Sequence, residues 1–154
     1  MVASEALECF GGNGYIEDSD MPRLYRELPL LSIWEGSGNV AALDTLRAVS
    51  REPQSLDAYF AEVELAAGND RRFDDALDRL KKEFTSFDDI ELRARRIVEE
   101  LALVFQGSLL LQHAPAAVAD AFCATRLDRD WGNAFGTMPA SVDRDTIIER
   151  IGIA

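Results

Sequence analysis

The chain has 154 residues, 47% of them hydrophobic, and its formal net charge is −12. This length and composition suit one domain, or one domain with an appendage, and they argue against a disordered chain. The acidic excess is −5 over residues 1–50 (3 Arg against 8 acids) and −7 over residues 51–154 (13 Lys and Arg against 20 acids). Binding to a phosphate backbone needs a basic surface, so nucleic acid is not an expected partner unless a local basic patch exists.

Membrane, metal and triad chemistries also find little support. No apolar run approaches the roughly 20 residues that a membrane helix needs. Residues 1–5 have neither the basic region nor the apolar core of a signal peptide, which argues against secretion. Cys9 and Cys123 lack metal-ligand spacing and are expected to be buried, reduced thiols of a cytoplasmic protein. His113 is the only histidine, which argues against a His-based triad and a His/Cys zinc site.

The first 36 residues predict two short helices joined by loops. Residues 2–10 have helical apolar spacing with no capping residue before them, which suggests that the chain begins inside a helix of a larger protein. Glycines 11, 12 and 14 should end this helix, because glycine tolerates the left-handed conformation. An acidic loop over 17–20 follows. Asp20 could then cap a helix that has Pro22 in its first turn and is stopped by Pro29. Residues 30–36 are predicted to form a buried, extended loop.

The remainder is predicted to be helical. A helix should open at Ser37 or Gly38 and end before Pro53, with Val40 and Arg47 on its inward stripe. Further helices are expected over about 55–67, 70–84, 88–112, 115–131 and 143–151. Their expected caps are Ser55, Asn69 or Asp70, a capping box of Asp88 with Glu91, and Asp143. Trp131-Gly132-Asn133 should end the fourth of these helices and lead into a loop. With no convincing strand, the fold class is all-α, a helical bundle or a pair of helical layers with a soft boundary at 51–54.

Glu35 is the first candidate for chemistry. Ile33 and Trp34 favour burial, so the carboxylate should lie near an apolar wall. Loss of water there raises a carboxyl pKa and suits a general base. Taken alone, a glutamate beside a glycine is more often a solvated loop residue.

The other candidates have plain structural interpretations. Gly11-Gly12-Asn13-Gly14 could present amides to a phosphate, but without a preceding strand or a P-loop lysine it is first of all a helix-ending turn. Arg23 and Arg26 should form salt bridges with the acidic loop or Glu27. Arg47 should be paired or contact a ligand. The basic clusters at 81–82 and 93–96 stand among acids and indicate a solvated face.

In this order and spacing, the segments resemble the C-terminal helical domain of the acyl-CoA dehydrogenases. The resemblance covers residues 1–51 and consists of Phe10–Tyr15 (FGGNGY), Arg26-Glu27 and Ile33–Ser37 (IWEGS). Residues 22–27 and 32–39 resemble the AidB-type, or alkylation-response, branch more narrowly. Residues 55–154 resemble, more loosely, the extra helical region of that branch. The resemblance therefore implies a helical domain over 1–51 that carries the catalytic loop, and an added helical region over 52–154 packed on it.

The resemblance implies an FAD enzyme in which a glutamate removes the α-proton of an acyl-CoA thioester while a hydride passes to the flavin. Glu35 occupies the base position of most of the family, although some members place the base on another helix. Its backbone amide would polarise the thioester carbonyl. The remaining implied positions are Gly36 and Arg47 on the substrate side, Ser37 and Asn39 beside FAD, and Glu8 and Gly12 against the FAD of a neighbouring subunit in a homo-oligomer.

The family's N-terminal helical domain and middle β-domain are missing from this sequence. The chain is therefore expected to supply one wall of the active site and to be silent, without retained FAD, when isolated. Two alternatives stay open. One is a non-enzymatic helical module for oligomerisation or interaction, which would use exposed apolar surface. The other is a DNA-damage protection protein of AidB type, although the −7 charge of residues 51–154 argues against DNA binding.

Overall fold

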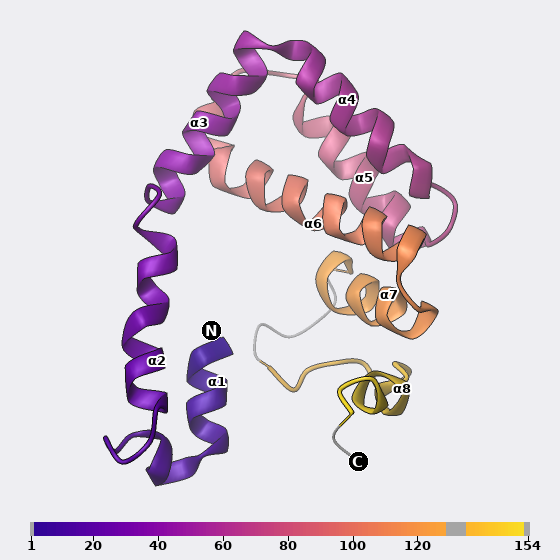
Figure 1. The fold of residues 1–154 in the computed structure, drawn as a ribbon. Coiled ribbons are helices and arrows are strands. Elements are labelled where there is room, and N and C mark those ends of the chain that lie inside the picture. Colours follow the sequence, from indigo (N-terminus) through magenta and orange to yellow (C-terminus); the bar gives the residue numbers. More distant parts are fainter. Residues whose placement is uncertain (1, 129–134, 153–154) are drawn as a thin grey trace. The chain divides into compact units, whose positions relative to one another are not determined.

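The computed structural model describes residues 2–128 and 135–152. Those residues contain helices and turns but no strand, which confirms the all-α fold class. The chain forms two compact units, Met1–Ala42 and Leu43–Ala154, called here the N-terminal and C-terminal units (Figure 1). Their boundary lies inside helix α3 (Gly38–Arg51). The division at residues 51 and 52 follows the family resemblance instead, and it stays a prediction.

The N-terminal unit pairs two short helices. Helices α1 (Val2–Cys9) and α2 (Met21–Glu27) contact each other, and they run side by side in Figure 1. Gly11 is left-handed at φ 57°, so the predicted glycine end of α1 is confirmed. The turn continues as a 3₁₀ helix, Gly11–Gly14. Pro22 lies in the first turn of α2 as predicted, but the Asp20 side chain makes no capping hydrogen bond.

Residues 28–36 differ most from the prediction. Helix α2 ends at Glu27, just before Pro29, as predicted, but the chain then continues as a 3₁₀ helix, Leu28–Ser32, with the proline in its first turn. Proline is tolerated there, since its missing N–H would have no helical partner. The predicted buried, extended loop is therefore wrong: Leu31, Ile33 and Trp34 are 69%, 62% and 63% exposed. A unit of about forty residues has too little core to cover them.

The C-terminal unit is built around the longest helix. Helix α6 (Ala94–His113) packs along α5 (Arg71–Glu83) and also contacts α4 (Pro53–Val63) and α7 (Ala116–Phe122) (Figure 1). The remaining segments are 3₁₀ helices at Glu64–Ala66 and Ile90–Arg93, a π-helical turn at Cys123–Leu127, and α8 (Arg144–Glu149). The predicted end at Trp131-Gly132-Asn133 lies outside the described residues.

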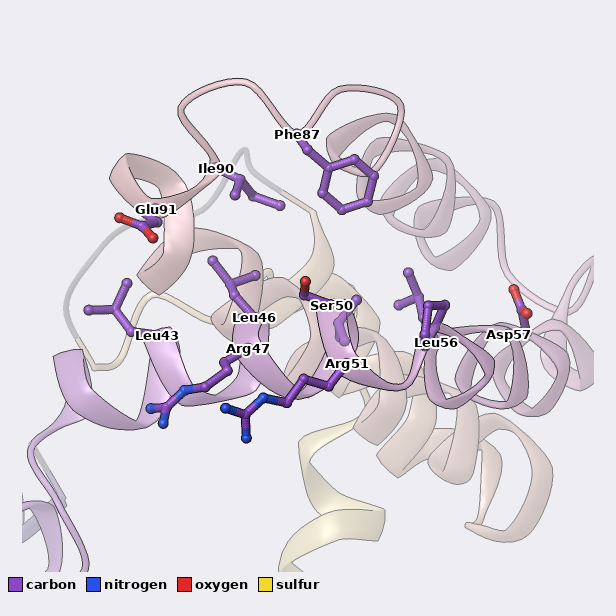
Figure 2. A pocket seen from close by; sticks show the side chains of 12 residues that line it. Leu43, Leu46, Arg47, Ser50, Arg51, Leu56, Asp57, Phe87, Ile90 and Glu91 are labelled. Carbon is purple, nitrogen blue, oxygen red and sulfur yellow. The ribbon is translucent and has the colours of Figure 1, made fainter.

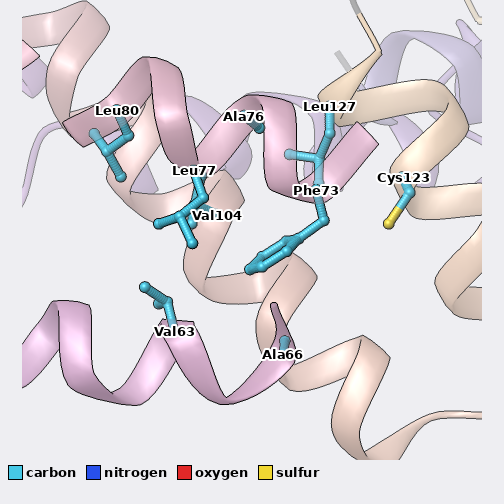
Figure 3. Close-up of a cluster of buried hydrophobic side chains, with 9 residues drawn as sticks. All are labelled: Val63, Ala66, Phe73, Ala76, Leu77, Leu80, Val104, Cys123 and Leu127. Carbon is cyan, nitrogen blue, oxygen red and sulfur yellow. The ribbon is translucent and has the colours of Figure 1, made fainter. Parts of the chain in front are cut away.

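The largest apolar cluster described in this unit lies between α4, α5, α6 and the π-helical turn (Figure 3), and a smaller one joins Ala121, Ala124 and Val142. The buried members of the larger cluster are Val63, Ala66, Phe73, Ala76, Leu77, Leu80, Val104, Cys123 and Leu127. Gly107 on α6 keeps the helices close, since a Cβ there would lie 3.0 Å from Leu127 Cδ1 and 3.3 Å from Phe73 Cδ2. The Tyr59 hydroxyl ties α4 to α6 by donating to the Leu101 carbonyl at 2.7 Å.

Two of the predicted caps are confirmed. The Asp70 carboxylate accepts from the backbone N–H of Arg72 at 2.7 Å, at the start of α5. The Asp143 carboxylate accepts from the backbone N–H of Thr146 at 3.1 Å, at the start of α8. Both carboxylates accept hydrogen bonds from N–H groups that a helix start leaves without an intrahelical partner.

Two other predicted caps are wrong. Helix α4 begins at Pro53, two residues before Ser55, whose hydroxyl donates to the Glu52 carbonyl instead. The expected capping box of Asp88 and Glu91 does not form, because Asp89 takes a left-handed conformation at φ 50° and the chain enters a 3₁₀ helix.

Candidate functional site

Glu35 lies in a tight turn that leads from the 3₁₀ helix Leu28–Ser32 into α3. The N–H of Trp34 donates to the Leu30 carbonyl at 3.0 Å, and the N–H of Gly36 donates to the Ile33 carbonyl at 3.0 Å. Glu35 itself is exposed, as is the indole of Trp34. The turn thus presents the carboxylate to solvent, and the apolar wall expected around it is not built from this chain alone.

Gly36 is required by its backbone conformation. Its φ is 109°, which L side chains rarely adopt, and a Cβ there would come no nearer than 3.7 Å to its closest neighbour, Val40 Cγ1. The reversal brings the chain into α3, where the N–H of Ala41 donates to the Ser37 carbonyl at 3.0 Å. Ser37 and Asn39 are exposed beside this helix start. The first N–H groups of a helix lack intrahelical partners and attract hydrogen-bond acceptors.

The glycines of the Gly11–Gly14 turn serve different purposes. Gly11 supplies the left-handed conformation, and Gly14 is buried where a Cβ would lie 2.5 Å from the Leu7 carbonyl oxygen. Gly12 has neither constraint, because its φ is not left-handed and a Cβ there would meet nothing within 4 Å. Nothing in the described part of the chain therefore demands a glycine at Gly12. Glu8 is exposed on the last turn of α1, just before this segment.

The arginines of α2 tie the acidic loop to the helix, as expected. Arg26 bonds both oxygens of Glu17, at 2.7 and 3.1 Å. This bidentate hydrogen bond lowers the pKa of the Glu17 carboxyl and raises the pKa of the Arg26 guanidinium. Arg23 lies 3.9 Å from Asp20. The structural interpretation of these arginines is confirmed.

Arg47 is paired but does not lie on the inward stripe. Its guanidinium lies 2.6 Å from the Asp44 carboxylate, and both side chains are more than half exposed. Leu46 is buried, and Arg47 follows it by about 100° around the helix, which turns the arginine outward. Val40 is also exposed. Arg47 belongs to the C-terminal unit, whereas Glu8, Gly12, Glu35, Gly36, Ser37 and Asn39 belong to the N-terminal unit.

The basic clusters form ion pairs, and their side chains are exposed as predicted except that of Arg93, which is only 27% exposed. Lys81 lies 2.8 Å from Glu64, and Arg93 and Arg96 both pair with Glu83. The cysteine prediction is half right, since Cys123 is buried but Cys9 is exposed. Burial raises the pKa of the Cys123 thiol to about 11. Within residues 2–128 and 135–152, no three His, Cys, Asp or Glu side chains gather as a metal site. No helix in those ranges is long and apolar enough to cross a membrane.

A cleft in the C-terminal unit was not foreseen from the sequence. It has a volume of about 870 Å³ and is lined from α3, the first turns of α4, and the segment that carries Phe87, Ile90 and Glu91 (Figure 2). These segments are up to 48 residues apart along the chain, from Leu43 to Glu91, so no local pattern predicts the cleft. The one sequence signal is Phe87, a large apolar residue within a polar connection.

Comparisons with known proteins agree with the resemblance. Residues 1–50 match the family described as "Acyl-CoA dehydrogenase, C-terminal domain". The chain is 40% identical to the putative acyl-CoA dehydrogenase AidB of Escherichia coli (strain K12), over 84% of this chain and 24% of that protein. It is 36% identical to acyl-CoA dehydrogenase family member 11 of Caenorhabditis elegans, over 73% of this chain and 21% of that protein.

A shorter match is to the mitochondrial isovaleryl-CoA dehydrogenase of Pongo abelii, 41% identical over 33% of this chain and 12% of that protein. The similarity to AidB extends over 129 residues and so reaches well beyond the first 50. The chain spans about a quarter of the length of AidB and about a fifth of the length of family member 11.

Proposed function

Because this chain belongs to the acyl-CoA dehydrogenase family, we propose that it serves the α,β-dehydrogenation of an acyl-CoA thioester and that Glu35 is the base. The observation that carries the proposal is the turn of Glu35. The positive φ of Gly36 and the hydrogen bond from its N–H to the Ile33 carbonyl hold the Glu35 carboxylate just before the first turn of α3, where it is exposed to an incoming substrate. A general base must reach its proton directly, and this position allows it.

Glu35 would act through two groups. Its carboxylate would take the proton from the carbon next to the thioester carbonyl, and its backbone N–H would donate to the carbonyl oxygen where negative charge develops. A solvated carboxylate is a weak base for a carbon acid. An apolar wall closed over Glu35 would remove water from the carboxylate and make it a stronger base. Gly36 would leave room for the thioester, and Arg47 would lie on the substrate side.

The exposed groups beside Glu35 fit an FAD site. FAD, when bound, supplies the hydride acceptor. Ser37 offers a hydroxyl and Asn39 an amide at the start of α3, both exposed. Gly12 would face the FAD of a neighbouring subunit, which agrees with the empty space around its Cα. Glu8 would lie on the same side, but its carboxylate repels phosphate oxygens, so Gly12 is the better supported of the two contacts.

The chain by itself would neither retain FAD nor turn over acyl-CoA. Support comes from the exposure of Glu35 and of the apolar side chains around it, and from the match to AidB, which covers only 24% of that protein. The family's N-terminal helical and β-domains would supply the missing walls. We also propose a homo-oligomer in the cytoplasm, where a free buried thiol such as Cys123 stays reduced.

The test uses the complete flavoprotein that carries this chain. Glu35→Gln should keep FAD bound while flavin bleaching by acyl-CoA slows by about 10²–10⁴, the usual contribution of a general base. Glu52→Gln is the matched control, since Glu52 is an exposed glutamate outside the turn, and it should react like the parent. Bleaching of Glu35→Gln at the parent's rate would place the base elsewhere.

One observation favours a second candidate, a non-enzymatic interaction module. The N-terminal unit exposes many apolar side chains, among them Tyr15, Leu31 and Trp34, and such surface commonly marks a protein interface. Light scattering on the isolated chain separates the two. A clean monomer would count against the module, and a yellow preparation that retains flavin would count against the incomplete site. The third interpretation, DNA protection, would require salt-sensitive duplex binding despite the net charge of −12.

A further inference from the structure

We propose that the cleft of the C-terminal unit is a binding site for an uncharged aliphatic chain. Its floor includes Leu46, Val49 and Leu56, and Phe87 and Ile90 form the opposite wall. In Figure 2 the side chains of Phe87 and Ile90 point toward α3 and α4. The cleft volume of about 870 Å³ falls in the range of about 300–1,000 Å³ that small-molecule pockets occupy. Every lining residue belongs to the C-terminal unit.

The loop wall is held in place by one arginine. Arg93 donates to the Ser86 carbonyl at 3.0 Å and to the Asp88 carbonyl at 3.2 Å, and it pairs with Glu83 at the end of α5. The segment from Ser86 to Asp88, which carries Phe87, is therefore held against the end of α5 by Arg93. Phe87 nevertheless remains 60% exposed. Its ring contacts that of Phe84, with centroids 6.5 Å apart, and the exposed remainder is apolar surface that a ligand can bury.

The charges at the rim argue against a charged ligand. Arg47 and Arg51 lie on α3, Asp57 on α4 and Glu91 on the 3₁₀ helix Ile90–Arg93, so two positive and two negative side chains line the cleft. Arg47 is already paired with Asp44. The apolar part of the lining is branched aliphatic apart from Pro53 and Phe87, so a flat aromatic ligand would find only Phe87 to stack on.

The length of the cleft favours a chain over a compact ligand. Its lining on α3 runs from Leu43 to Arg51, which is about 12 Å of helix at 1.5 Å per residue. It then continues onto α4 to Asp57. Val49 and Leu56 also line a second, shallower apolar hollow with Tyr59 and Phe105, so they form a partition that limits the cleft on that side.

Straight-chain alcohols from butan-1-ol to decan-1-ol test the proposal on the 154-residue chain. Binding is followed by NMR of ¹³C-labelled Leu, Val and Ile methyl groups. Affinity should rise about fourfold for each added methylene, the transfer gain for one CH₂ group. Methyl shifts should be confined to cleft residues such as Leu46, Leu56 and Ile90. Decanoate and decylammonium should both bind more weakly than decan-1-ol.

A pair of tryptophan variants locates the site. Ser50 lines the cleft and is exposed, so Ser50→Trp should fill it and reduce decan-1-ol affinity at least tenfold. Ala48→Trp is the control, because Ala48 is exposed on the same helix outside the cleft lining, and it should bind like the parent. Circular dichroism confirms that both variants fold. If Ser50→Trp fails to fold, the methyl shifts and the charge series still decide.

Four results would overturn the proposal. If the affinity for the alcohols stopped rising after butan-1-ol, the cleft would hold only a short apolar group, such as a side chain of a partner protein. Tighter binding of either charged amphiphile would show a charged ligand. Unchanged affinity in a folded Ser50→Trp would remove the cleft as the site. Methyl shifts at exposed residues of the N-terminal unit, such as Leu30, Leu31 and Ile33, would show unspecific adhesion.

Discussion

A Cβ at Gly14 would lie 2.5 Å from the carbonyl oxygen of Leu7, so α1 and the turn after it meet at a distance that only glycine allows. This contact fixes where the following loop leaves α1. It also separates the purpose of Gly14 from that of Gly12, two residues earlier, where a Cβ would meet nothing within 4 Å.

Gly14→Ala should therefore destabilise the N-terminal unit, by about 1–3 kcal/mol, because backbone must move to admit the methyl group. Gly12→Ala should leave the unfolding free energy unchanged but weaken FAD retention in the complete flavoprotein. Chemical denaturation and flavin absorbance of the two variants measure these effects. Equal destabilisation by both substitutions would contradict the distinct purposes of the two glycines.

Asp70→Ala should reduce the unfolding free energy by about 1–2 kcal/mol, because it removes the cap of α5 and one partner of Arg72. Asp78→Ala, at an exposed position of the same helix, should have little effect. Urea denaturation at neutral pH measures both. Equal losses would show that the effect comes from charge or helix propensity and not from the cap.

Stability should also fall in acid through Asp70. The hydrogen bond from the Arg72 side chain is the main cause that lowers the pKa of Asp70 in the folded state below its ordinary value. The folded state therefore binds fewer protons than the unfolded state near that pH. The contribution of the Asp70 carboxylate to the free energy of unfolding is complete above the pKa of the unfolded state, and it is lost as pH falls through the pKa of the folded state. Asp70→Asn should flatten this acid limb of the stability curve.

Tyr59→Phe should cost about 1 kcal/mol, because the Leu101 carbonyl loses its hydrogen bond from the hydroxyl. Burial raises the pKa of Tyr59 in the folded state. The unfolded chain therefore ionises first, and the parent should lose stability as pH rises above about 10. Thermal unfolding at pH 8 and above pH 10 measures the difference. Tyr25→Phe, at an exposed tyrosine, should change neither the stability at pH 8 nor its loss above pH 10.

Local signals in the sequence predicted local structure well. Gly11, Asp70 and Asp143 perform the turn and capping functions expected of them, since those depend on a few neighbouring residues. Asp20 stands directly before α2, but its backbone is helical (φ −75°, ψ −13°) where a capping residue is usually extended, and its side chain makes no capping bond. Ser55 did not cap because α4 begins two residues earlier, at Pro53.

Burial was predicted less well because it depends on partners. Ile33 and Trp34 have side chains suited to a core, but they stay exposed because the N-terminal unit contains nothing that covers them. The cleft of Figure 2 was invisible because its walls come from segments far apart along the chain. The residues of the proposed base turn were recognised by family resemblance. Physical pattern alone could not separate Glu35 from any solvated loop glutamate.

The most direct test of Glu35 as the base is exchange of the substrate's α-hydrogen. An α-deuterated acyl-CoA is incubated with the complete flavoprotein, and loss of deuterium to water is followed by NMR or mass spectrometry. The account predicts rapid loss with the parent protein and with Glu52→Gln, and loss only at the background rate with Glu35→Gln that still holds its FAD. Deuterium loss from Glu35→Gln at the parent's rate would contradict it.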